Sequence, residues 1–244
     1  MIRRKPNPIT VLYTDPETGY GPPWLVSVPA PLRRQDLNDA PGKGEGAGEP
    51  AAVLKWLRTT HHAYDVGRSE LRMTWCNRGS EQMVVDSATA RVLSRSERQH
   101  ETLFDSSNGG PEPRFEFGFD LDDPRPTPVR INADGMLERG QPRFGHEIVK
   151  LPPGDQVAVG AVGRITKGDC EWEIELRLVI GKGKSTQRIG GAHGQPIRTA
   201  AEHVDGRYPF EWVTGLALEC EDAQVPPYLH DRHLDEAPEP LTED

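Results

Sequence analysis

The sequence predicts an all-β protein: an antiparallel β-sandwich, immunoglobulin-like or jelly-roll-like, with one short helix. The first observation is a series of roughly seven to nine short segments in which apolar and polar residues alternate, separated by turn residues. The second is that no amphipathic helices lie between these segments, as the crossovers of a parallel sheet would require. The third is the run Cys170–Ile180, which has the clearest alternation in the chain.

The run Cys170–Ile180 is expected to be a central strand of the sandwich. Side chains of a strand point alternately to opposite faces, so this pattern buries one face and exposes the other. The apolar face contains Cys170, Trp172, Ile174, Leu176, Leu178 and Ile180. The opposite face begins with Glu171, Glu173, Glu175 and Arg177.

The remaining elements follow from the same patterns. A helix is expected over 51–63, because Val53, Leu54 and Leu57 share a helical face and Pro50 suits the first helical turn. The other strand segments are 9–14, 23–29, 69–79, 81–97, 114–121, 147–165, 186–189 and 208–220.

Four regions are expected along the chain. Residues 1–37 would be an N-terminal β arm packing on the core, and residues 38–50 a flexible loop rich in Gly and Pro. Residues 51–221 would form the β-sandwich domain. Residues 222–244 would be an acidic tail without stable structure of its own.

The acidity of the chain is concentrated at its C-terminal end. The net charge is −9, and residues 219–244 contain nine acidic residues and one basic residue, Arg232. The remainder is therefore close to neutral and has no basic stripe, which argues against nucleic-acid binding. No apolar run is long enough to span a membrane, and no apolar run follows the basic N-terminus as in a secretory signal. The expected location is the cytoplasm.

The three cysteines predict neither a zinc site nor a disulfide framework. Cys76, Cys170 and Cys220 are widely spaced and lie in apolar segments, where a free thiol usually behaves as a small buried hydrophobe. A bridge between Cys170 and Cys220 stays open as an alternative if the protein is exported. No cofactor is predicted.

Two segments resemble known binding motifs but lack essential parts of them. Gly181–Thr186 contains Gly-Lys-Ser, yet a phosphate-binding loop needs another Gly where Leu178 stands, so a hairpin turn is expected. Asp120–Asp123 brings acids together without the residue series of a calcium loop, so a solvated strand end is favoured. No metal site is predicted, and the weak candidates are His230 and His233 in the tail.

The candidate ligand- or partner-binding residues are His193, Arg198, Glu171, Glu173 and Glu175. Residues 190–198 form a Gly-rich loop between two expected strands, and loops on a rigid sandwich often bind ligands. Arg198 could hold a carboxylate or phosphate, or pair with a neighbouring acid. The three glutamates could act as paired carboxylates or simply form a solvated or partner-facing surface. No catalytic residue is predicted.

Four segments carry a resemblance to other proteins: LRMTWCNRGSEQMVV, FGFDLDDPRP, CEWEIELRLVI and GGAHGQPIRTAAEHVDGRYPFEW. Together they resemble a β-rich region found in many uncharacterised actinobacterial proteins, across roughly residues 50–220. The resemblance implies a β-rich fold and no particular activity.

The function expected from the sequence is that of a non-enzymatic β-sandwich module that binds another protein or copies of itself. It would use its loops, an exposed sheet face and its edge strands, and the acidic tail would steer a basic partner. The alternative is a small-ligand-binding or hydrolase-like sandwich that uses the 190–198 loop.

Overall fold

The computed structural model describes residues 9–13, 24–41, 50–97, 100–106, 115–132, 136–144, 148–191, 195–202, 208, 210–214 and 229–231. The chain divides into two compact units, each built from three separate stretches. Unit 1 contains Met1–Asp15, Val66–Glu97 and Pro111–Glu202, and unit 2 contains Pro16–Asp65, Arg98–Gly110 and His203–Asp244. These boundaries differ from those of the four expected regions, and most of 38–50 and 222–244 lies outside the described residues.

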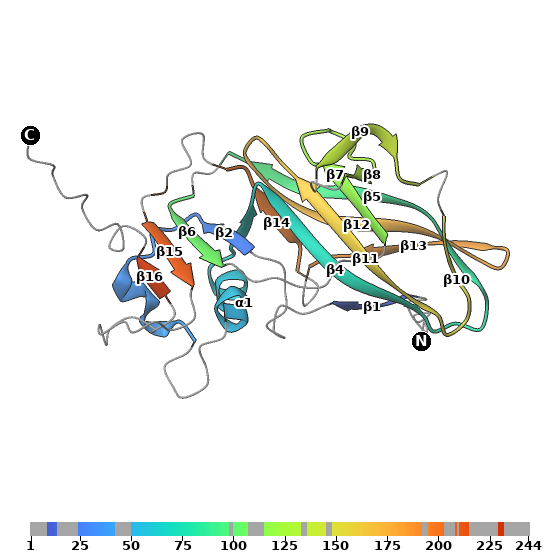
Figure 1. The fold of residues 1–244 in the computed structure, drawn as a ribbon, viewed down its shortest axis with the longest axis horizontal. Helices are drawn as coiled ribbons and strands as arrows, with labels where there is room; N and C mark the ends of the chain where they lie inside the picture. The colour runs from blue at the N-terminus through green and yellow to red at the C-terminus, as the bar shows by residue number, and fades with distance from the viewer. Residues whose placement is uncertain are drawn as a thin grey trace, which may run out of the picture. The chain divides into compact units, whose positions relative to one another are not determined.

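The first layer of unit 1 is a sheet of six strands within the described residues, here called sheet A (Figure 1). Its order across the sheet is β1 (Ile9–Tyr13), β4 (Arg68–Asn77), β11 (Gln156–Arg164), β7 (Phe115–Asp120), β8 (Val129–Ile131) and β9 (Leu137–Pro142). Neighbours run antiparallel except β7 and β11, which are parallel.

The second layer of unit 1, here called sheet B, is antiparallel throughout. Its order is β10 (Val149–Leu151), β5 (Met83–Ser96), β12 (Asp169–Ile180) and β14 (Ile197–Ala200). A further strand, β13 (Gly183–Ile189), pairs with β12 on the same side as β14, farther along β12. The long strand β12 is therefore the centre of this layer.

The hydrophobic core of unit 1 lies between the two sheets. Sheet A contributes Trp75, Phe117 and Phe119, and sheet B contributes Trp172 and Leu176, all of which are fully buried. The ring centres of Phe119 and Trp172 are 5.8 Å apart in an edge-on arrangement, so the sheets pack directly on each other. Unit 1 is a β-sandwich, and the predicted fold class is confirmed.

The predicted apolar face of β12 is also confirmed. Cys170, Trp172, Ile174, Leu176 and Leu178 are almost completely buried in this core, and Ile180, the last residue of the predicted face, is partly buried against it. The alternation follows from the pleat, which turns successive side chains to opposite faces of the sheet. The hairpin expected at Gly181 is present, because β12 continues through a tight turn into β13.

The structure differs from the prediction in strand number and direction. The described residues form sixteen strands, and two of the pairs, β7 with β11 and β6 (Thr102–Ser106) with β15 (Phe210–Thr214), are parallel. Alternation identifies a strand but not the direction of its neighbour. The chain joins β7 to β11 through β8, β9 and β10 instead of a crossover helix. Sheet A and the strands of unit 2 are therefore mixed, while sheet B is antiparallel.

Unit 2 contains the only α-helix of the described residues, α1 (Pro50–Thr60). Its strands follow the order β3 (Tyr64–Val66), β2 (Trp24–Val28), β6, β15 and β16 (Leu229–Asp231), and a short 3-10 helix, η2, covers Arg34–Asp39. Val53, Leu54 and Leu57 of α1 are buried with Phe104, as the helical pattern predicts. No helix in the described part of the chain is long and apolar enough to cross a membrane.

Candidate functional site

The outward face of sheet B has a set of paired charges in three neighbouring groups. We call this set the charged ladder. Its members are Asp86 and Arg91 on β5, Glu171, Glu173, Glu175 and Arg177 on β12, Arg188 on β13 and Arg198 on β14. Because residues of one strand face the same side at every second position, the acids of β12 come into register with the basic residues of its neighbours.

Glu173 and Glu175 of the ladder share one arginine, Arg188. Glu173 accepts from Arg91 at 2.7 Å and lies 3.3 Å from Arg188, which is also 3.3 Å from Glu175. Arg177 donates to Asp86 at 2.6 Å. Four acids face four arginines, so the ladder is neutral overall.

Arg198 belongs to the ladder and does not point into an open loop. Its Nε donates to Glu171 Oε1 at 2.9 Å, and only 12% of its side chain is exposed. The peptide N–H of Gly191 donates to the carbonyl of Gln195 at 2.7 Å, which closes the base of the 190–198 loop. His193 lies outside the described residues. The structure thus brings Arg198 and Glu171 together, as in the structural alternative stated above.

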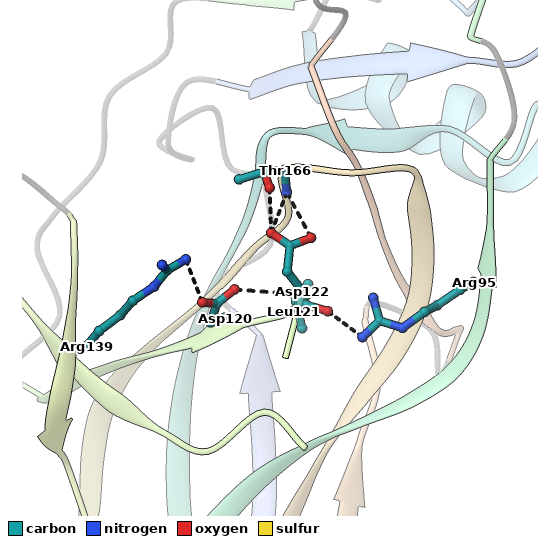
Figure 2. Close-up of polar contacts among 6 residues, drawn as sticks. All are labelled: Arg95, Asp120, Leu121, Asp122, Arg139 and Thr166. Atoms are coloured by element: carbon teal, nitrogen blue, oxygen red, sulfur yellow. Dashed lines mark hydrogen bonds and ion pairs between the residues drawn. The ribbon is translucent and has the colours of Figure 1, made fainter. Parts of the chain in front are cut away.

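The acidic turn after β7 is braced by hydrogen bonds (Figure 2). Asp120 pairs with Arg139 of β9 at 2.7 Å. Asp122 accepts from the backbone N–H of Thr166 at 3.0 Å and from its hydroxyl at 2.7 Å. These carboxylates point to different donors and share no common centre. The turn is a structural feature of the strand end, in line with the favoured interpretation.

Metal ligands do not gather in the described part of the chain: no group of three His, Cys, Asp or Glu side chains there could hold an ion. His230 lies in β16, whose side chains are not described, and His233 lies outside the described residues.

The two described cysteines are free thiols, so Cys170 forms no bridge with Cys220 in this structure. Cys170 is 1% exposed, and desolvation by burial raises the pKa of its thiol to about 12, partly opposed by the nearby cation of Arg95. A thiol with such a pKa carries almost no thiolate at neutral pH. It is a core residue, as the sequence predicts.

Unit 2 contains a serine–histidine pair that could not be predicted from the sequence. Ser27 Oγ lies 2.9 Å from His100 Nδ1, although the two residues are far apart in the chain. This is the distance that a nucleophile and its base require. However, Ser27 is 0% exposed and His100 is 4% exposed, so a substrate cannot reach the hydroxyl in this conformation. The pair satisfies two buried polar groups.

Strand β13 has an open edge. It is bonded to β12 along one side, and no strand of the described residues pairs with its other side. Gly181 has φ +56°, which suits the first central position of a two-residue II′ hairpin turn. Such a loop makes Ile180 and Gly183 a hydrogen-bonded pair.

The alternation of an antiparallel ladder then fixes which backbone groups face outward. Starting from Gly183, the N–H and C=O of Ser185 bond to β12, and those of Lys184, Thr186 and Arg188 point away from it. We call these three residues the free edge of β13. All three are exposed to solvent.

The edge of β5 is guarded, in contrast. The N–H of Ala90 donates to the carbonyl of Pro126 at 3.3 Å, and the Arg95 guanidinium donates to the carbonyls of Leu121 and Asp123. The pairing with β12 shifts register twice, so β5 has bulges that interrupt its edge. A covering segment and bulges are both devices that prevent strand addition.

No family model matches the chain, and no curated protein matches it.

Proposed function

We propose that the chain is a non-enzymatic β-sandwich module that binds another protein, or a second copy of itself, by adding a strand to the free edge of β13. The observation that carries the proposal is the single-sided pairing of β13 among the described strands. Strand addition satisfies the outward N–H and C=O groups of an edge, and these backbone bonds supply the affinity.

The residues around β13 favour a role in protein binding over a role in catalysis. The carboxylates of the charged ladder are bonded to arginines, and the Ser27 hydroxyl is buried. The ladder continues up to Arg188 at the free edge, so a partner strand would add to an already ordered charged surface. We expect the module to act in the cytoplasm, as the sequence predicts.

Sheet A also ends in edge strands, β1 and β9. The edge of β9 is irregular, because it contains Pro142 and a Gly140 with φ +80° and its pairing with β8 shifts register. Such an edge is less suited to a continuous added strand.

The proposal is tested by a proline at the free edge. Thr186→Pro removes an outward N–H and blocks an incoming strand, while the hydrogen bonds of Ser185 to β12 stay intact. The matched control is Thr186→Ala, which keeps the N–H. Self-association is measured by light scattering on a size-exclusion column, and partner binding by a photocrosslinker at position 184, with the exposed Ala158 of sheet A as the control position.

We expect oligomers or one specific crosslinked protein with the unmodified chain and with Thr186→Ala, and their loss with Thr186→Pro. A monomer that crosslinks equally at positions 184 and 158, or not at all, would contradict the proposed function.

A further inference from the structure

The chemistry of the free edge points to the kind of strand that it accepts. We propose that β13 binds an extended segment of an acidic partner protein, with carboxylates opposite Lys184 and Arg188. This inference rests on the proposed function and names the class of partner that the same edge would take.

No acidic residue of the described strands lies directly opposite Lys184. Its cross-strand neighbour on β12 is Val179, which in turn faces Val84 of β5. Lys184 is exposed, and its side chain lies on the outward face. A carboxylate on an added strand would be the first acidic neighbour of Lys184 across the sheet, and opposite-charge pairs in this position are favourable.

Arg188 is the last cation of a row in which charges alternate. Glu175 of β12 lies opposite it, and both Glu173 and Glu175 contact its guanidinium at 3.3 Å. Half of the Arg188 side chain is exposed, at 55%. An acid on the next strand would continue the alternation of the charged ladder by one further position.

The geometry also sets the spacing of these acids. Lys184, Thr186 and Arg188 face the same side, and their backbone N–H and C=O groups all point to the added strand. An incoming strand would therefore place one acid opposite Arg188, a small polar or β-branched residue opposite Thr186, and a second acid opposite Lys184. The recognised pattern is two acids separated by three residues in an extended segment.

The same charges disfavour a second copy of this chain as the occupant. In an antiparallel pairing of two β13 strands centred on Thr186, Lys184 of one copy would oppose Arg188 of the other. Like charges directly opposite each other destabilise a strand pair. Edge lysines are a common means of preventing such self-pairing, and they leave an acidic strand unhindered.

The test uses full-length protein and the capped peptide TEVTVET, which has the inferred spacing, with TKVTVKT as the matched peptide of opposite charge. Binding is followed by amide hydrogen exchange and by shifts of the amide resonances of β13. In the free protein we expect rapid exchange at Lys184, Thr186 and Arg188 and slow exchange at Ser185. TEVTVET should slow exchange at the first three, with a dissociation constant on the order of 0.1–1 mM.

Charge reversal at the free edge of β13 distinguishes specific binding of the peptide at this edge from non-specific electrostatic attraction between the peptide and the protein. Lys184→Glu should weaken TEVTVET binding roughly tenfold and strengthen TKVTVKT binding. The matched control is Lys150→Glu on the exposed face of β10, which should leave both peptides unaffected. Added salt should weaken TEVTVET binding to the unmodified chain.

Each outcome separates this inference from the proposed function. Equal binding of both peptides, no binding, or shifts on the ladder without slower exchange at Thr186 would overturn the acidic-strand inference. The proposed function would stand in those cases if Thr186→Pro still abolished partner capture or oligomers. Slow exchange of the Thr186 amide in the free monomer would overturn both, because the edge would already be covered.

Discussion

The indole N–H of Trp172 on β12 donates a hydrogen bond to the hydroxyl of Thr199 on β14, with 2.8 Å between the two atoms. Both residues are 0% exposed, and the Thr199 hydroxyl also lies 2.6 Å from the hydroxyl of Ser69 on β4. A large aromatic side chain can occupy the centre of a core only if its polar atom finds a partner there. Thr199 provides that partner from the neighbouring strand.

The contribution of this bond can be measured by Thr199→Val, which keeps the shape of the side chain and removes the hydroxyl. The buried indole N–H would lose its acceptor, so we expect the free energy of unfolding to fall by about 1–3 kcal/mol. Urea unfolding followed by tryptophan fluorescence measures the loss. Thr199→Ser keeps the hydroxyl and is the control, and equal stability of the two variants would show that the bond contributes nothing.

The close approach of the two sheets at Gly163 predicts a second effect. A Cβ atom at Gly163 on β11 would lie 2.4 Å from Cζ2 of Trp172 and 3.0 Å from Leu121. The indole is rigid and enclosed, so Gly163→Ala should cost about 1–3 kcal/mol through overpacking. Gly183→Ala is the control, because the nearest atom to its Cβ is 3.4 Å away. A Gly163→Ala variant that melts at the same temperature as this control would contradict the described packing.

Substitution of Arg198 distinguishes a structural role of this residue from a ligand-binding role. Because its largely buried pair with Glu171 joins β14 to β12, Arg198→Ala should lower stability by about 1 kcal/mol, and less in high salt. A double-mutant cycle with Glu171→Ala isolates the pair from other effects of each substitution. An unchanged melting temperature together with loss of a small-molecule ligand would instead favour the alternative in which the 190–198 loop binds a ligand.

Cys170 predicts a pH dependence at the alkaline end. The thiol has a pKa of about 12 in the folded protein, against a reference value of 9.0. Below pH 9 the thiol is protonated in both states, so its contribution to stability is fully present there. Above pH 9 the unfolded chain loses the proton first, and this contribution is lost progressively as the pH rises towards 12.

The same pKa predicts the order of thiol reactivity. At pH 8 the partly exposed Cys76 should be alkylated before Cys170, which should react only when the chain unfolds. Mass spectrometry of peptides after a brief iodoacetamide pulse, with and without denaturant, measures both sites. Rapid labelling of Cys170 in the native protein would be incompatible with its buried position.

The sequence was most informative where one strand faces both core and solvent. The alternation of β12 predicts its buried face residue by residue, and the spacing of Val53, Leu54 and Leu57 predicts α1, because burial follows the period of the backbone. The parallel pairing of β7 with β11 could not be predicted, because alternation has no direction. The candidate residues Glu171 and Arg198 were identified, but not their bond, which depends on the register between β12 and β14.

The contact between Ser27 and His100 and the open edge of β13 were beyond prediction for a related reason. Both depend on which strands become neighbours, and a single sequence contains no local signal for that choice. The hairpin at Gly181 was predictable, since its turn chemistry is local. In contrast, no described strand pairs with the outer side of β13, and this depends on how all the strands of the sheet are arranged.

Unit 1 is built from three separate stretches of the chain, and this affects how the protein folds during its synthesis. Val85 of β5 faces Leu178 of β12, a partner about ninety residues later in the chain, and such distant pairings slow folding. On the ribosome, β4 and β5 emerge long before β11 and β12, whose side chains complete the core that buries their apolar residues. The nascent chain therefore exposes Trp75 and Met83 while roughly the next hundred residues are synthesised, a period in which chaperone binding would protect it from aggregation.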